Sequence, residues 1–184
     1  MNSKFECFIN VKKKSKIAVD KNKIKKLKKI WYNIYFIFRN VLKSYISMNL
    51  KKKKIEILCD TKLSVYSKNF ETFFDALCVG FSVKDSSVLL LSDRILFIKV
   101  SLENLVDKKY RRKFLIMNLI GKNGIIKTII ENSLNIRIKI YCNSIYIIST
   151  YKNFNLFRKL MHNSKFKNPV QIQTQIGKLL KDVH

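Results

Sequence analysis

Two glycines three residues apart, Gly121 and Gly124, most constrain how this chain can fold. The chain has only 4 glycines among 184 residues, and two of them lie in the segment Ile120-Gly121-Lys122-Asn123-Gly124. Because glycine has no Cβ atom, both positions tolerate a positive φ and the close approach of another backbone. Apolar residues recur at helical spacing on both sides, so we predict a tight turn between two helices. The second helix would then present unpaired N–H groups and its positive dipole end to an anion.

The elements predicted around this turn follow the order of one small fold. They are a strand at 95–100, a helix at 107–120, the turn, a helix at 125–133, strands at 136–140 and 145–149, and a helix around Phe154, Phe157 and Met161. This is the order of a eukaryotic-type (type I) KH domain, whose Gly-x-x-Gly loop binds about four nucleotides of single-stranded RNA. In the helix before the turn we expect Tyr110, Phe114 and Met117 to face inward.

The first half of the chain has a related pattern without a Gly-x-x-Gly turn. Apolar residues from Leu27 to Tyr45 recur every three or four positions and predict one long helix. Alternating residues on both sides of Lys51–Lys54 predict a β-hairpin, and helices are expected from Ser67 and at 83–91. We therefore predict an α+β fold with two tandem type I KH domains, the first degenerate. The predicted divisions are a basic arm at 1–15, a degenerate KH-like domain at 16–93, a KH domain at 94–163 and a C-terminal tail at 164–184.

The charge of the chain narrows the class of partner. It has 38 Lys and Arg against 12 Asp and Glu, a formal net charge of +26, which favours a polyanion such as nucleic acid or an acidic membrane. The abundance of Lys, Ile and Asn is also what AT-rich coding produces, so part of this charge has a compositional explanation. The apolar run at 30–38 is too short to span a bilayer and predicts a buried amphipathic helix, so no membrane partner is expected.

Neither metal binding nor catalysis is supported by the residue pattern. The acidic residues are dispersed, with no carboxylate cluster suited to Mg²⁺, and no nucleophile and base can be paired. A zinc site needs clustered thiolates or imidazoles, but the cysteines are far apart in the sequence: Cys7, Cys59, Cys78 and Cys142. We therefore predict a non-enzyme without a metal or other cofactor, and mostly buried, reduced cysteines.

A series of short motifs extends over residues 20–170. They are Trp31, Asn49-Leu50-Lys51, Ile55-Glu56-Ile57, Gly80-Phe81-Ser82-Val83-Lys84-Asp85, Ile120–Gly124, Ile130-Glu131-Asn132, Arg137-Ile138, Asn153, Leu156 and Arg158. In this order and spacing the chain resembles the Partner of NOB family, KH-domain assembly factors of the eukaryotic small ribosomal subunit. Lys127 adds to the resemblance, because most KH domains have an apolar residue there and this family tends to have lysine. The chain departs from the family in its short basic N-terminus and in Asn168-Pro169, where the family has a double proline.

The resemblance implies a non-catalytic RNA-binding role in the pre-small-subunit particle. Family members bind near the 3′ end of the small-subunit rRNA precursor and assist its final cut by a partner endonuclease of the NOB type. The rRNA adenine dimethyltransferase is a further implied partner. The implied location is the nucleus and nucleolus, then the cytoplasm with the maturing subunit. If the AT-rich composition reflects a reduced genome, the nucleus would be that of the reduced compartment.

We expect the RNA-binding residues to surround the glycine turn. Gly121 and Gly124 would admit the sugar-phosphate backbone, and Lys122 and Lys127 would supply charge. Ile120, with Ile138 and Ile140, is either an apolar floor for bases or part of the core. The basic cluster at 111–113 either contacts neighbouring phosphates or is a solvated helix face. The full predicted set is Gly121, Lys122, Asn123, Gly124, Lys127, Ile120, Arg137, Arg111, Arg112 and Lys113.

Two other hypotheses remain open at this point. One is a KH assembly factor of the KRR type, which tends to carry an Ile-Gly-Pro-x-Gly loop, whereas Lys122 occupies the proline position here. The other belongs to a different class, a basic membrane-surface or structural protein in which Gly121 and Gly124 are incidental. That hypothesis predicts lipid binding that survives replacement of both glycines.

Overall fold

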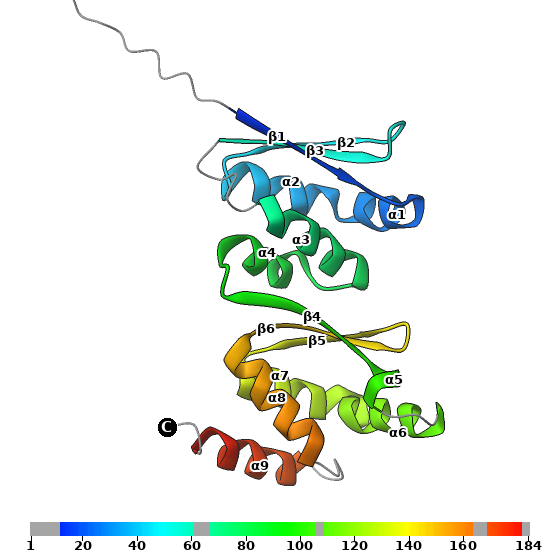
Figure 1. The fold of residues 1–184 in the computed structure, drawn as a ribbon, viewed down its shortest axis with the longest axis vertical. Helices are drawn as coiled ribbons and strands as arrows, with labels where there is room; N and C mark the ends of the chain where they lie inside the picture. The colour runs from blue at the N-terminus through cyan, green and yellow to red at the C-terminus, as the bar shows by residue number, and fades with distance from the viewer. Residues whose placement is uncertain (1–11, 61–66, 106–108, 164–168, 182–184) are drawn as a thin grey trace, which may run out of the picture. The chain divides into compact units, whose positions relative to one another are not determined.

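Each half of the chain builds one three-stranded antiparallel sheet with helices packed against it (Figure 1). A computed structural model describes residues 12–60, 67–105, 109–163 and 169–181. The chain divides into two compact units, Met1–Cys78 and Val79–His184. The elements of the first unit are β1 (Lys12–Ala18), α1 (Lys21–Lys29), α2 (Trp31–Asn40), β2 (Tyr45–Asn49), β3 (Lys54–Asp60) and α3 (Ser67–Val79).

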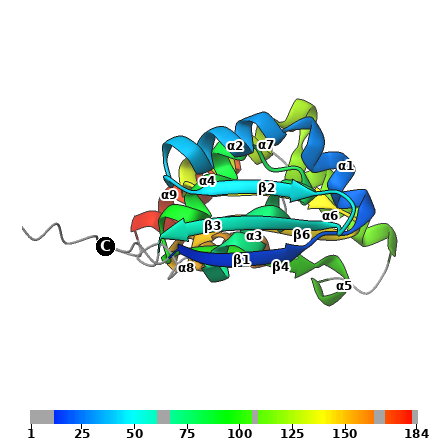
Figure 2. The ribbon, with the colours of Figure 1, turned by 90° about the horizontal axis from the view of Figure 1, so that it is seen from above.

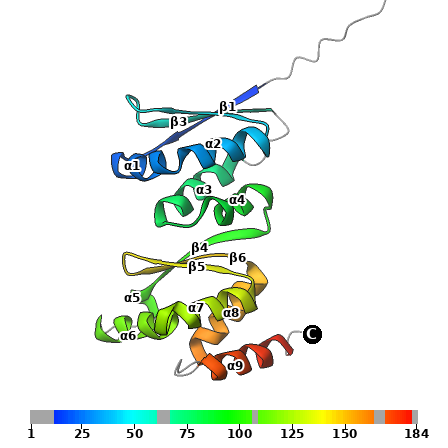
Figure 3. The same ribbon diagram turned by 180° about the vertical axis from the view of Figure 1, so that it is seen from behind.

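The first unit has the β-α-α-β-β-α order of a type I KH domain. Its strands lie in the order β1-β3-β2, and Figure 2 shows β3 between the other two. Helices α1, α2 and α3 lie on one side of this sheet (Figure 3). The core contains the fully buried Ile34, and the ring of Phe38 lies 5.7 Å from that of Phe70 and 5.9 Å from that of Phe73. The predicted hairpin and the helix from Ser67 are confirmed.

The prediction of one long helix from Leu27 to Tyr45 is wrong. Ile30 has φ −113° and ψ 12°, which interrupts the helical conformation for one residue and separates α1 from α2. Helix α2 ends at Asn40, and Tyr45 already belongs to β2. The apolar spacing predicted a longer helix because Val41 and Tyr45 continue the period of the buried residues. Both side chains are nevertheless exposed.

Strand β1 lies partly within the segment predicted to be a basic arm. It pairs with β3 in antiparallel register, with Ile17 opposite Ile55. Its sequence, Lys-Lys-Lys-Ser-Lys-Ile-Ala, contains a single large apolar residue. The alternation that usually marks a strand is therefore almost absent, and the partner strand supplies what the local pattern lacks.

The second unit repeats the KH order with a helix added at each end and a short helix inserted after its first strand. Its elements are α4 (Val83–Leu91), β4 (Ile95–Ser101), α5 (Leu102–Leu105), α6 (Lys109–Ile120), the 3₁₀ turn η2 (Lys122–Gly124), α7 (Ile125–Leu134), β5 (Arg137–Tyr141), β6 (Ser144–Thr150), α8 (Tyr151–Asn163) and α9 (Pro169–Lys181). The strands lie in the order β4-β6-β5. Figures 1 and 3 show α6, α7 and α8 on one side of the sheet and α4 on the other. Because α4 packs against β4 and β6, the chain divides after Cys78, earlier than the predicted boundary after residue 93.

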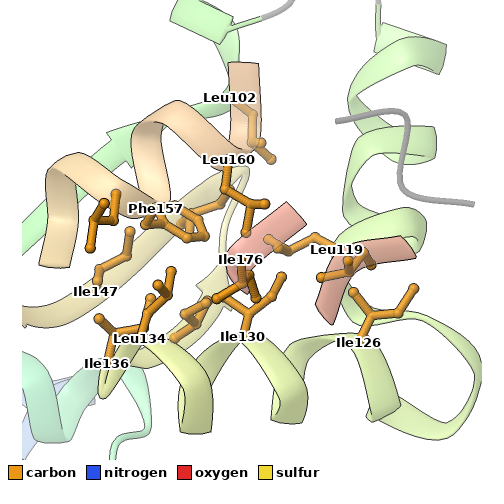
Figure 4. Packing of buried hydrophobic residues seen from close by; sticks show 14 residues of the cluster. Leu102, Leu119, Ile126, Ile130, Leu134, Ile136, Ile147, Phe157, Leu160 and Ile176 are labelled. Carbon is orange, nitrogen blue, oxygen red and sulfur yellow. The ribbon is translucent and has the colours of Figure 1, made fainter. Parts of the chain in front are cut away.

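Helix α9 occupies most of the segment predicted as a C-terminal tail. Pro169, the only proline of the chain, is its first residue, where a fixed φ and a missing N–H are harmless. Ile172 and Ile176, four residues apart, are buried in the core of the second unit. Figure 4 shows Ile176 among side chains of α7 and α8. These residues are therefore an integral part of the unit.

The inward face of α6 also differs from the prediction. Phe114 is 62% exposed and Met117 is 60% exposed, whereas Leu119 is fully buried. Leu115 and Ile116 pack against the same core. Helix α6 carries large apolar residues on both faces, so helical spacing alone fits two opposite orientations. The side chain of Tyr110 lies outside the described residues.

Within the described ranges, no helix is long and apolar enough to cross a bilayer. The same residues contain no group of three His, Cys, Asp or Glu side chains placed to hold a metal ion. Cys59 and Cys78 are buried, and Cys142 is exposed in the turn between β5 and β6. Burial raises the pKa of the Cys78 thiol. Cys7 lies outside the described residues.

Candidate nucleic-acid interface

The Gly-x-x-Gly loop joins α6 to α7 and contains three residues with positive φ. Gly121 has φ 72°, Asn123 has φ 54° and Gly124 has φ 78°. The N–H of Gly121 donates to the carbonyl of Met117 at 2.8 Å, which closes α6. Glycine and asparagine are the residues that adopt this conformation at least cost. The local sequence therefore specifies this turn directly.

Gly121 and Gly124 differ in whether the surrounding structure has room for a side chain. A Cβ at Gly121 would lie 2.6 Å from Cγ1 of Ile126, a core residue, so packing forbids a side chain there. A Cβ at Gly124 would meet none of the described atoms within 4 Å. Gly121 is therefore needed for the fold itself. Gly124 leaves an open place on the surface where another backbone can approach.

The N-terminus of α7 is suited to an anion. Gly124 is its N-cap residue, the cap receives no side-chain hydrogen bond from the described residues, and the first turn contains no acidic residue. Lys122 and Asn123 are exposed immediately before it. The positive end of the helix dipole and the Lys122 ammonium act in the same direction, so a phosphate would be attracted to this point.

Lys127 is held beside the loop by a partly buried series of polar contacts. Its Nζ lies 3.1 Å from Oε2 of Glu131, and Oε1 of Glu131 accepts the Ile138 backbone N–H at 2.7 Å. These contacts connect α7 to β5, an edge strand of the sheet. Glu131 was not among the predicted site residues, although its position four residues after Lys127 is the signal that could have identified it.

The isoleucines near the loop divide between core and surface. Ile138 is fully buried and Ile140 packs partly buried against the same cluster. Ile120, the last residue of α6, is half-buried. The core interpretation therefore holds for Ile138. The exposed apolar residue next to the loop is instead Ile125, which was not among the predicted site residues.

The basic cluster on α6 lies apart from the loop. At 1.5 Å per residue, Lys113 precedes Gly121 by about 12 Å along the helix. Nη1 of Arg112 lies 3.3 Å from Oε1 of Glu103, whereas Arg111 and Lys113 are exposed. These residues flank the loop along α6 and do not surround it.

The structure does not bring Arg137 to the loop. Its side chain alternates with that of buried Ile138 and so lies on the other face of the sheet. Its Nε is 3.1 Å from Oδ1 of Asp85 in the first turn of α4, where Ser82 caps the helix by accepting the Asp85 N–H. The pairing of Arg137 with Asp85 joins two of the sequence motifs and holds α4 against the sheet.

Comparisons with known proteins identify similar chains. No protein-family model matches the sequence. The chain is 30% identical over 149 residues to the RNA-binding protein pno-1 of Caenorhabditis elegans, covering 77% of this chain and 53% of that protein. It is 29% identical over 150 residues to the pre-rRNA-processing protein PNO1 of Gibberella zeae, covering 78% and 58%. The chain thus spans little more than half the length of these relatives.

Solved structures show the same fold at low sequence identity. Dim2p from Pyrococcus horikoshii superposes with a TM-score of 0.64 and 16% identity over 90% of this chain and 99% of that one. A chain of the a/eIF2alpha-aDim2p-rRNA complex from the same organism gives a TM-score of 0.64 and 17% identity, covering 94% and 96%. These likenesses cover residues of both units, so the fold of each unit is one already seen in solved proteins.

Proposed function

Since this chain is a homologue of the PNO1 (partner of NOB1) pre-rRNA-processing proteins, we propose that it binds single-stranded pre-ribosomal RNA through its Gly-x-x-Gly loop. The observation that carries this proposal is the geometry of the loop. Left-handed Gly121 and Gly124, the open surface at Gly124 and the uncapped start of α7 together suit a phosphate backbone.

The residues proposed to contact RNA are of two kinds. Gly121, Asn123 and Gly124 form the backbone surface, and Lys122 and Lys127 provide charge on either side of it. Ile120 and Ile125 border the loop as apolar neighbours. Arg111, Arg112 and Lys113 are proposed as outer phosphate contacts along α6. Arg137 is supported only as a structural residue, because its guanidinium pairs with Asp85.

The proposed role is binding and placement of RNA, with cleavage by another protein. In the finer form of the proposal, the RNA is the 3′ region of the small-subunit rRNA precursor and the partner is an endonuclease of the NOB type. The rRNA adenine dimethyltransferase is a second proposed partner, and the nucleus and nucleolus are the proposed location. The names of the relatives, RNA-binding and pre-rRNA-processing proteins, support the coarser part of this role.

A charge placed at Gly124 tests the loop without disturbing the core. Gly124→Asp adds a carboxylate in open space, and Gly124→Asn adds the same shape without charge; both residues tolerate the left-handed conformation. We expect Gly124→Asp to weaken binding of single-stranded RNA by roughly tenfold to a hundredfold relative to Gly124→Asn, because like charges would meet at the interface. Fluorescence anisotropy of a labelled oligonucleotide measures this. Equal affinities for the two variants would exclude the loop as the phosphate site.

Crosslinking of RNA in cells tests the identity of the ligand. Reads concentrated at the 3′ end of small-subunit rRNA precursors are expected, and they should be reduced in the Gly124→Asp variant. Reads spread over all abundant RNA would contradict a processing role and favour charge-driven binding. Sedimentation with anionic vesicles is the parallel control, since a membrane-surface protein would bind them equally with and without Gly124→Asp.

A further inference from the structure

Helices α1 and α2 of the first unit follow each other directly in the chain, with the helical conformation interrupted at Ile30. Ile30 is the one residue between them, and its carbonyl still accepts the N–H of Ile34 at 3.2 Å. Buried residues keep the helical period across this junction: Ile24, Leu27, Ile34 and Phe38. A second set repeats at spacings of four, three, four and three on the opposite side. This set, which we call the α1–α2 stripe, consists of Lys25, Lys29, Tyr32, Phe36 and Arg39.

All five residues of the stripe are exposed, and its two rings are exposed to an unusual degree. Tyr32 is 78% exposed and Phe36 is 54% exposed. Tyr32, Phe36 and Arg39 lie at spacings of four and three on α2, and Lys25 and Lys29 lie four residues apart on α1. Large apolar side chains gathered on one exposed surface mark an interaction site.

The charge of the stripe indicates which kind of partner it fits. Residues 21–40 contain lysine and arginine but no Asp or Glu. Lysine is depleted in the centres of protein–protein interfaces. Surfaces that bind single-stranded nucleic acid instead combine cations that follow the backbone with aromatic rings on which bases stack. The composition of the stripe therefore matches single-stranded RNA better than a protein.

The stripe continues from the helix to the edge of the sheet. Cζ of Arg39 lies 4.3 Å from the ring centroid of Tyr45, and Tyr45 is an exposed residue of the edge strand β2. A hydrogen bond to the Tyr45 side chain raises the pKa of Arg39. A guanidinium held flat on a ring is fixed in orientation and can still donate to a phosphate from its rim.

We propose that the α1–α2 stripe is a second surface for single-stranded RNA, with bases stacked on Tyr32 and Phe36 and phosphates bound by Lys25, Lys29 and Arg39. The two rings are about 6 Å apart along the helix axis, on successive turns, so each has room for its own base. Recognition would tolerate any sequence, because every base has a π-face. The proposal rests on the proposed RNA-binding function for its ligand class, but it uses no residue of the Gly-x-x-Gly loop.

The double variant Tyr32→Ala/Phe36→Ala of the full chain tests the stacking. We expect its affinity for a long uridine-rich single-stranded RNA to fall by at least about tenfold, since stacking of one base on one ring contributes roughly that factor. The slope of log K against log salt should stay unchanged, because no phosphate contact is removed. The matched control is Tyr151→Ala, which truncates a 68% exposed tyrosine on α8 and should leave the affinity unchanged.

The double variant Lys25→Gln/Lys29→Gln tests the phosphate contacts. It should flatten the salt slope by about 1.4, two phosphates at about 0.7 each for a single strand. Its control is Lys51→Gln/Lys52→Gln in the exposed turn between β2 and β3, which should leave the slope unchanged. Far-UV circular dichroism establishes that each variant is folded.

Ultraviolet crosslinking of the unmodified chain should label the tryptic peptide of residues 30–39, and absence of that label would count against the proposal.

The Gly124→Asp variant, measured in parallel, separates the two hypotheses. Weaker binding by Gly124→Asp together with unchanged binding by Tyr32→Ala/Phe36→Ala would overturn the stripe and leave the proposed function standing. Weaker binding by the ring variant alone would support the stripe and count against the loop. If the stripe binds a protein instead, Tyr32→Ala/Phe36→Ala would leave the affinity for RNA unchanged. That result would also overturn the proposal.

Discussion

The two units place the same order of strands and helices around two different helix junctions. In the first unit a single residue, Ile30, joins the helices at a negative φ. In the second unit four residues join them, and Gly121, Asn123 and Gly124 have positive φ. The sheet order is equivalent in both. The glycine loop is thus an addition to this fold and not a requirement of it. One junction leaves open space beside the backbone of Gly124, where we propose that RNA binds, and the other consists of a residue that carries a side chain.

The units also differ in how the second helix is tied to the edge strand. In the second unit Glu131 accepts the backbone N–H of Ile138 in β5. In the first unit Arg39 lies over the ring of Tyr45 in β2. A partly buried carboxylate that satisfies a backbone donor is costly to remove. When an exposed cation–ring contact is lost, water can solvate both groups. The loop-bearing unit therefore depends more strongly on its connection.

Gly121→Val should produce the largest change in this comparison. The branched side chain would overlap Ile126 and would be forced into the left-handed region, so we expect a loss of about 3 kcal/mol in the free energy of unfolding. Urea denaturation followed by circular dichroism measures it. Gly177→Ala is the control, because its Cβ meets no described atom within 4 Å and alanine should stabilise α9 by up to about 1 kcal/mol. A wild-type midpoint for Gly121→Val would refute the packing argument.

Glu131→Ala should have the next largest effect on stability. It leaves the Ile138 N–H without its acceptor and Lys127 without its partner, which should cost about 1–3 kcal/mol. Glu131→Gln keeps an acceptor oxygen and should lose less. Amide hydrogen exchange at Ile138, followed by NMR, should be faster in the alanine variant than in the glutamine variant. Equal exchange in both would show that the carboxylate does not protect this edge.

Arg39→Ala should destabilise its own unit less than Glu131→Ala destabilises the second. The Arg39 side chain is exposed, and its contact with Tyr45 is made in water, where a cation over a ring contributes little. A double-mutant cycle with Tyr45→Leu, which removes the ring, measured by thermal unfolding, isolates this contact. A coupling larger than the loss from Glu131→Ala would reverse the comparison between the units.

Lys122→Gln should have the smallest effect, visible mainly in salt dependence. Removing one phosphate contact should flatten the slope of log K against log salt by about 0.7 for single-stranded RNA. Lys51→Gln, an exposed lysine of the first unit's hairpin, should leave the slope unchanged. Titrations at several salt concentrations compare the two. Equal slopes would mean that Lys122 has no more contact with phosphate than a distant surface lysine.

The sequence predicted most of the fold because most strands and helices here carry clear periods, with β1 as an exception. The glycine loop was predictable because glycine is rare in this chain and its conformational need is specific. Other features depend on distant partners. Helix α6 is apolar on both faces, so Phe114 and Leu119 could not be assigned without the sheet. Arg137 pairs with Asp85, 52 residues away in the sequence, and no local spacing of residues predicts such a contact.

The strand registers have a consequence for the order in which the second unit assembles. Strands β5 and β6 are joined by a two-residue turn, with Tyr141 opposite Ser144. By contrast, Ile98 of β4 pairs with Ile147 of β6, and helices α5, α6 and α7 lie between these strands in the sequence. Closing a long loop costs more entropy than closing a short one, and distant pairings form slowly. We therefore expect the hairpin to form early and β4 to join late. The late strand would then also be the first to detach when the unit opens.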